Sequence, residues 1–210
     1  RTALLHLAVF HALSGGSGLN RHNGLNTAIA FVAMIAASSA TFGVEQLAAQ
    51  SDEIEKALSA APARARDATT VIRWHADQSY EVLREGEGPL VCYDRSTEAR
   101  RAPFDIQCTS MGNLDRVAQS RQFRAEAADR EAETVMIEAA EASDTRIPPE
   151  YGSVWFSLRG QDHARATLHM TVAVPYATSE NSGFPANGRA GGLWIMDEGT
   201  STAHLMVPGR

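Results

Sequence analysis

RATLHMTVAV, residues 165–174, is the stretch that decides the fold, because large apolar side chains return at every second position along it. A period of two is typical of a β-strand, whose side chains point alternately to the two faces of a sheet. One parity is entirely apolar and comprises Ala166, Leu168, Met170, Val172 and Val174. The other parity holds Thr167, His169 and Thr171. The stretch therefore predicts a strand with one aliphatic face and a second, more polar face.

The same alternation recurs in three other stretches near the C-terminus, residues 153–159, 193–197 and 203–207. Turn residues separate the strands in pairs, GQDH at 160–163 and EGT at 198–200, which is typical of two β-hairpins. We expect the aliphatic faces of these strands, including Leu168 and Met170, to pack on helices. Their second faces carry the candidate binding residues Trp155, His169, Trp194, Met196, His204 and Met206.

What covers this second face decides between two kinds of function. If the long loop 175–192 folds over it and leaves it partly wet, the face is an ordinary layer of an antiparallel sheet. If its aromatic side chains gather in the open, the face is a binding surface for a small molecule or a protein. Its histidine and methionine side chains could be soft metal ligands, and His204 and Met206 are two positions apart. A metal site would need ligands from several strands to converge, and the sequence does not show that they do. We predict no metal site and no cofactor.

Upstream, short β-branched and aromatic runs alternate with turns. The runs are TTVIRW (69–74), SYEVLR (79–84), PLVCY (89–93) and residues 105–109, and together they predict an antiparallel meander. Helical periodicity follows in residues 113–121 and 128–142, the second with Asp129 at the N-cap position. The order of these elements predicts a single α+β domain over residues 69–210. Its antiparallel sheet would hold a meander and two C-terminal hairpins, with helices packed on one face.

The N-terminal part of the chain has a different character. Residues 45–68 predict a helix and a short linker. Residues 1–44 predict a leader, because a basic flank precedes the apolar run AIAFVAMIAA at 28–37 and the small residues SSA follow at 38–40. This pattern favours a signal peptide cleaved near Ala40. The alternative is an uncleaved anchor, although a membrane span needs about 20 strongly apolar residues. We therefore expect a secreted or periplasmic protein with no stable membrane span after cleavage.

Export gives the two cysteines a meaning. Cys92 and Cys108 lie 16 positions apart, on either side of a polar loop at residues 94–103. In an oxidising compartment an even pair of cysteines forms a disulfide by default, so we predict this bridge. The alternatives are two buried free thiols or a thiol nucleophile.

The composition excludes several classes of function. The chain has 210 residues and a formal net charge of −6. An acidic chain is a poor binder of nucleic acid, because phosphate contacts need a basic footprint. Lys56 is the single lysine, and the other basic residues are arginines. The nucleophile elbow G-x-S-x-G, the phosphate loop G-x-x-x-x-G-K and the motifs H-E-x-x-H and C-x-x-C do not occur.

Four blocks, VLREGEGPLVCYD, PFDIQCT, TLHMTVAVP and AHLMVPG, resemble those of uncharacterised exported proteins of environmental bacteria, over about residues 69–210. That family has no assigned activity, so the resemblance implies only export and a compact, cysteine-paired domain. We interpret the chain as an exported soluble domain, a non-catalytic binding or structural module of the cell envelope whose partner is a small molecule or a protein. The alternative is a small hydrolase or metal-dependent enzyme that uses His169 or His204.

Overall fold

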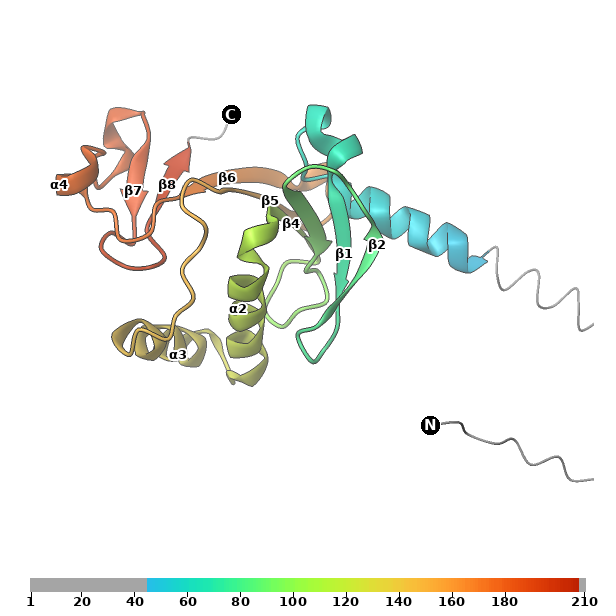
Figure 1. Ribbon diagram of the computed structural model, residues 1–210, viewed down its shortest axis with the longest axis horizontal. Helices are drawn as coiled ribbons and strands as arrows, with labels where there is room; N and C mark the ends of the chain where they lie inside the picture. Colours follow the sequence, from blue (N-terminus) through green and yellow to red (C-terminus); the bar gives the residue numbers. More distant parts are fainter. Residues whose placement is uncertain (1–44, 208–210) are drawn as a thin grey trace, which may run out of the picture. The chain divides into compact units, whose positions relative to one another are not determined.

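The structure, a computed structural model, describes residues 45–207 (Figure 1). The predicted leader 1–44 and its cleavage site lie outside the described residues. The chain from Leu47 onward forms one compact unit, built on an eight-stranded sheet. Helices and a mostly antiparallel sheet in one unit confirm the predicted α+β class.

The sheet is antiparallel at every pair of neighbouring strands except one. Its strands are β1 (Thr70–Trp74), β2 (Tyr80–Arg84), β3 (Leu90–Asp94), β4 (Phe104–Ser110), β5 (Val154–Gly160), β6 (Thr167–Ala173), β7 (Trp194–Met196) and β8 (His204–Val207). They lie in the order β2-β1-β3-β4-β5-β6-β8-β7, and only β1 and β3 run parallel.

The predicted meander was wrong at β3, which pairs with the far side of β1 instead of with β2. The reason lies in the two faces of each strand. A strand inside a covered sheet needs apolar side chains at both parities. Val91 and Cys92 provide them in β3 and are fully buried, whereas Tyr80 and Val82 of β2 stay exposed. The more apolar strand takes the interior position, and β2 becomes the edge.

Most of the helical segments follow the predicted ranges. Residues 45–58 are helical, and the other α-helices within residues 45–207 are α2 (Leu114–Glu126), α3 (Arg130–Ala142) and α4 (Ser179–Ser182). Short 3₁₀ turns occupy η1 (Ala63–Ala68), η2 (Met111–Asn113), η3 (His163–Arg165) and η4 (Gly188–Ala190). Asp129 caps α3, since its Oδ1 accepts the backbone N–H of Ala132 at 2.9 Å, as predicted. The predicted linker is the turn η1, and the long loop 175–192 contains α4 and η4.

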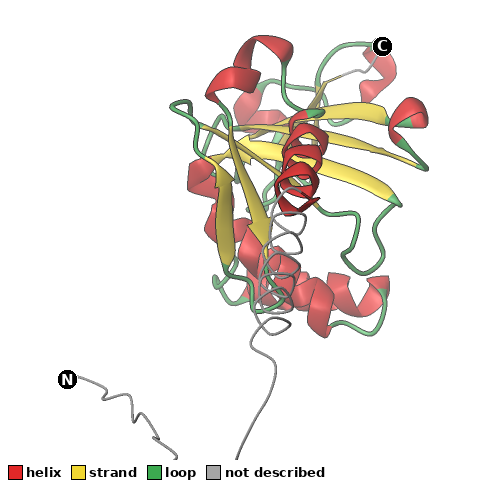
Figure 2. Cartoon of the chain, turned by 90° about the vertical axis from the view of Figure 1, so that its right-hand side faces the viewer, coloured by secondary structure: helices red, strands yellow, loops and turns green. Residues whose placement is uncertain are grey.

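Helices cover both faces of the sheet, so the prediction of helices on one face was wrong. The helix 45–58 buries Ala57 and Leu58 against a cluster on one face that includes Ile106. Helix α2 buries Leu114 and Val117 against the opposite face. Figure 2 shows the first helix in front of the strands, and in Figure 1 this helix and α2 lie on opposite sides of β1 and β4. Both faces need cover because β1 and β3 are apolar at both parities.

The helix 45–58 covers β5 but leaves β6 open, so the expectation that Leu168 lies in a helix-facing core was wrong. Leu158 and Leu168 are directly opposite each other on β5 and β6, yet Leu158 is 9 % exposed and Leu168 is 48 % exposed. We expect Leu158→Ala to lower the free energy of unfolding by about 2–5 kcal/mol. Leu168→Ala should lower it by about 1 kcal/mol or less, as a half-exposed site does. Urea denaturation of both variants checks this, and equal losses would show that another surface covers Leu168.

Candidate functional site

The predicted binding face forms a row across four neighbouring strands. Trp155 on β5 lies opposite Thr171 on β6, and Thr171 lies opposite Met206 on β8. Met206 in turn lies opposite Trp194 on the edge strand β7. Directly opposite residues of antiparallel strands share a face. The alternation of side chains along these strands therefore follows the sequence pattern, and the row lies on the face that α2 covers.

The remaining candidates lie on the same face, to either side of that row. His204 is opposite Met196 on β7, and His169 is opposite Ser157 on β5. Only Trp155 and His204 among the six candidates line the pocket beside α2. Met196 is 41 % exposed, and the other three are half-buried. The structure thus brings two of the predicted residues into one site and leaves the others along the sheet.

The pocket has a volume of about 240 Å³ and lies between the sheet and α2. Its sheet floor contains Gln107, Trp155, Thr171, Ala173 and His204. The opposite wall comes from α2, from the loop after β3 and from the segment after α3. Six arginines line the pocket: Arg95, Arg101, Arg116, Arg121, Arg124 and Arg146. None of the described aspartates or glutamates is a lining residue.

Helical spacing puts two of these arginines over the sheet. Leu114 and Val117 anchor the first turns of α2 in the core. Positions three and four apart share a helix face, so Arg121 and Arg124 continue the stripe that Val117 begins. The Arg121 guanidinium lies 5.0 Å from the centroid of the Trp74 ring, an attractive cation–π contact. The helix therefore has arginines at core-facing positions, where an apolar side chain such as leucine is usual.

At the β4 side of the pocket, carboxylates balance most of the charge. Glu98 accepts from Arg121, and from Arg124 Nη1 at 2.6 Å. Arg95 Nη2 donates to Asp105 Oδ1 at 2.6 Å, and both side chains of this pair are buried. Arg101 is less well paired, with its Nε 3.6 Å from the nearer Glu98 oxygen. Burial, with repulsion from the neighbouring arginines, lowers the pKa of Arg101 to about 10.

At the β8 side, the arginines meet mainly neutral groups. Arg116 donates to the Ile147 carbonyl, to Ser201 Oγ at 3.1 Å and to Thr202 Oγ1 at 2.9 Å. Glu141 accepts from the hydroxyls of Ser201 and Thr202, so it reaches Arg116 through these two groups and not directly. Burial is the largest cause that lowers the pKa of Arg116 to about 10, and repulsion from Arg146 adds to it.

Arg146 completes this end of the pocket. Its Nη1 donates to Gln119 Oε1 at 2.7 Å, and its Nη2 donates to Ser120 Oγ at 2.8 Å. Its Nε is buried without a hydrogen-bond partner among the described residues. Burial lowers the pKa of Arg146 as well. Within the described chain, neither Arg116 nor Arg146 has a carboxylate oxygen within ion-pair distance.

The histidines differ in what they offer the site. His204 Nδ1 lies 2.8 Å from the Thr202 carbonyl oxygen, which can only accept, so Nδ1 carries a proton. The neutral ring of His204 then has Nε2 as an acceptor, and the protonated ring donates from both nitrogens. His169 lies outside the pocket, where burial and the nearby Arg159 lower its pKa. In residues 45–207, no three His, Cys, Asp or Glu side chains gather as a metal site would require.

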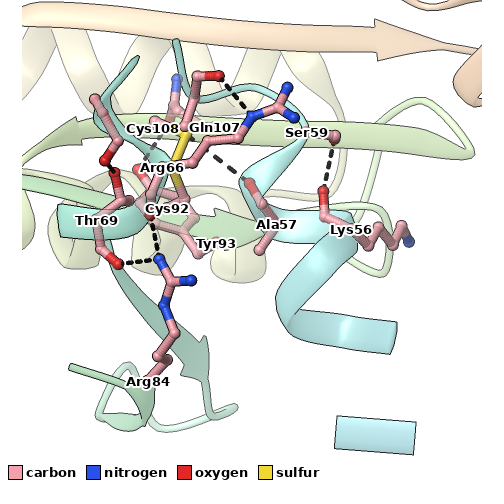
Figure 3. The surroundings of a disulfide bond; sticks show 12 residues. Lys56, Ala57, Ser59, Arg66, Thr69, Arg84, Cys92, Tyr93, Gln107 and Cys108 are labelled. Carbon is pink, nitrogen blue, oxygen red and sulfur yellow. Dashed lines mark hydrogen bonds between the residues drawn. A yellow bond between two sulfur atoms is a disulfide. The ribbon is translucent and has the colours of Figure 1, made fainter. Parts of the chain in front are cut away.

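The structure contains the predicted disulfide, shown in Figure 3. Cys92 and Cys108 are directly opposite each other on β3 and β4, and both are fully buried. Neither cysteine is therefore a free thiol. The bridge closes the segment that carries Arg95 and Arg101 of the pocket.

None of the six pocket arginines was predicted from the sequence as a site residue. One signal was present: the apolar stripe that starts at Leu114 and Val117 continues at helical spacing into Arg121, the last residue of the predicted helix, and into Arg124 beyond it. A charge at a core-facing position of a helix is unusual and indicates a site. The contributions of Arg95, Arg101 and Arg146 come from loops, and no periodicity places loop residues in space.

Comparison with protein-family models, with curated proteins and with solved structures gives no match to this chain. Among the described helices, none combines the length and the apolar character that a bilayer crossing requires.

Proposed function

We propose that the protein is an exported binding module of the cell envelope, whose pocket holds a small anion. The observation that carries this proposal is the lining of one pocket by six arginines and by none of the described carboxylates. Guanidinium groups bind carboxylate, phosphate and sulfate oxygens through paired, charge-assisted hydrogen bonds. A volume of about 240 Å³ suits a small molecule and not a polymer.

The balance of charge supports an anion as the occupant. A buried cation without a close counter-charge is destabilising, and Arg116 and Arg146 are both buried with neutral hydrogen-bond partners. Glu141 reaches Arg116 only through the Ser201 and Thr202 hydroxyls. An anion between the two arginines would supply the missing charge. The chain as a whole has a formal net charge of −6, so its outer surface disfavours long polyanions such as nucleic acid. A small anion inside the pocket experiences little of this repulsion.

Export is the second part of the proposal. The buried Cys92–Cys108 disulfide supports an oxidising compartment, where such bonds form and persist. The signal-peptide pattern in residues 1–44 supports it independently. We therefore propose that the protein works in the periplasm or outside the cell.

The position of His204 favours an enzyme as the second candidate function. This histidine lines the arginine pocket and keeps Nε2 free of the Thr202 contact, so it has the placement of a general acid or base. His169, the other histidine that the sequence suggested for an enzyme, lies outside the pocket. Release of phosphate from a phosphate ester, lost in His204→Gln, would favour a hydrolase over a binding module.

Saturable binding of inorganic phosphate tests the proposed function. We expect phosphate at about 100 times its dissociation constant to stabilise the fold by about 2.7 kcal/mol, while chloride at equal ionic strength does not. Arg146→Gln should weaken phosphate binding about tenfold or more, since a charge-assisted hydrogen bond contributes about 1.5–3 kcal/mol. Urea denaturation with and without phosphate measures the stabilisation, and isothermal titration calorimetry at pH 7 and low salt measures the two affinities.

The matched control is Arg130→Gln, which removes an exposed arginine from the first turn of α3. It changes the net charge of the chain as Arg146→Gln does but leaves the pocket intact. Equal weakening in both variants would show that phosphate responds only to net charge. Absence of saturable binding in the unmodified protein would overturn the proposal.

A further inference from the structure

The charges in the pocket are unevenly placed along its floor. In the sheet order, β5 and β6 lie between β4 and β8. Arg95 marks the β4 end, because its Nη1 donates to Gln107 Oε1 at 2.8 Å. Arg116 marks the β8 end, because it donates to Thr202, two residues before His204. The floor between the two ends belongs to β5 and β6.

The floor of that middle section carries no charged side chain. Its lining side chains are Trp155 on β5 and Thr171 and Ala173 on β6, with Val117 of α2 also in the lining. Trp155 is half-buried against the cluster that contains Val117. Thr171 lies directly opposite Trp155, and its short side chain leaves room beside the indole. An aromatic wall next to small side chains is typical of a slot for a flat apolar group.

The two ends also differ in their need for an anion. The Arg95–Asp105 pair and the Glu98 contacts already supply counter-charges at the β4 end. Arg116 and Arg146 at the β8 end have neutral partners. An incoming anion therefore gains most at the β8 end, which places the rest of its molecule over the uncharged middle.

Resting on the proposed function, we propose that the ligand is an amphiphilic organic anion of small-metabolite size. Its phosphate, phosphonate or carboxylate group is held by Arg116 and Arg146, and its flat, apolar body lies on Trp155 and Thr171. This assigns a class of ligand, aryl or similarly planar anions, instead of free inorganic anions.

Phenylphosphonate and methylphosphonate are the probes that test this class. They share the anionic group, resist hydrolysis and differ in the ring. We expect phenylphosphonate to bind about tenfold more tightly than methylphosphonate, because the ring buries apolar surface in the slot. Isothermal titration calorimetry with the full chain gives both dissociation constants.

Thr171→Ile fills the slot and should remove the preference for the ring while methylphosphonate still binds. Thr167→Ile is the matched control, since Thr167 lies on the same strand and face but outside the pocket lining. We expect the control to keep the tenfold preference. Thermal unfolding of both variants verifies that they fold, and Thr171→Ala, which keeps the slot open, should retain the preference if the isoleucine variant does not fold.

The outcomes separate the two proposals. Equal affinities for the two phosphonates would overturn the amphiphilic ligand and leave the anion pocket standing. A ring preference that survives Thr171→Ile would also overturn it, because the ring would then lie elsewhere. If neither phosphonate nor phosphate binds, the proposed function itself fails.

Discussion

Asp105→Ala is expected to lower the free energy of unfolding by about 3–5 kcal/mol, the range seen when one partner of a buried ion pair is removed. Asp105 Oδ1 accepts from Arg95 Nε at 3.0 Å and from Nη2 at 2.6 Å. Asp105 is 2 % exposed, and its partner is buried as well. Without the carboxylate, the Arg95 guanidinium stays buried with Gln107 as its remaining side-chain acceptor. Urea denaturation measures the loss.

A second substitution separates the stranded charge from the lost contacts. Arg95→Met in the Asp105→Ala background removes the unpaired guanidinium, so this double variant should be more stable than Asp105→Ala alone. Exchange of both members of a buried pair for apolar groups is often close to neutral. If the double variant is less stable than the single variant, the loss comes from packing and not from an unpaired charge.

The same variant connects the fold to the pocket. Arg95 lines the pocket, so Asp105→Ala adds one more unbalanced cation to its wall. Because the anion is proposed to bind Arg116 and Arg146 at the β8 end, phosphate should stabilise Asp105→Ala and the unmodified chain by equal increments. A larger increment in Asp105→Ala would show that the anion also approaches Arg95.

The alternation of side chains along the strands gave the most reliable predictions from the sequence. Large apolar side chains at every second position placed Trp155 and Met206 on one face, and the register of β5, β6 and β8 aligns them with Thr171 between. Side-chain alternation is a property of the single strand and needs no knowledge of its neighbours. For the same reason, the capping of α3 by Asp129 was predictable from one residue and its position.

Features that depend on neighbours were not predictable in this way. The parallel pairing of β1 with β3 reflects competition between two strands for the buried position beside β1, which sequence order does not decide. The exposure of Leu168 depends on where the helix 45–58 stops covering the sheet, and Leu158 across from it has the same local pattern. Tertiary cover, and not periodicity, distinguishes the two leucines.

The pocket contains residues that sequence periodicity can place and residues that it cannot. Trp155 and His204 reach it by strand alternation, and Arg121 and Arg124 reach it by helical spacing. Arg146 comes from a loop and is held by Ser120 of α2, a contact that spans 26 positions of sequence. A charged stripe on a core-facing helix can therefore be found from sequence, but the closure of the pocket cannot.

Replacing both Cys92 and Cys108 with alanine is expected to lower the free energy of unfolding by about 3 kcal/mol, the value for a closed loop of about 15 residues in the chain-entropy model. The two cysteines are 16 positions apart and fully buried, so alanine leaves no polar group in the core. Urea denaturation of the oxidised protein and the double variant measures the difference. Alkylation of exported, unreduced protein should modify neither cysteine.

Reductant provides the internal control for this prediction. It should destabilise the unmodified protein by a similar amount and leave the double alanine variant unchanged. Two alkylated thiols in exported protein would contradict the disulfide, and with it one of the supports for an oxidising compartment.

Phosphate binding to the double alanine variant shows whether the disulfide acts on the unfolded chain or on the folded pocket. In the chain-entropy model the disulfide restricts the unfolded chain and not the native one. The folded pocket of the double alanine variant should therefore bind phosphate with unchanged affinity, even though Arg95 and Arg101 lie on the segment that the bridge closes. A clear loss of phosphate affinity would show instead that the bridge holds this segment in place, because the paired strands β3 and β4 alone would then be insufficient to position the two arginines.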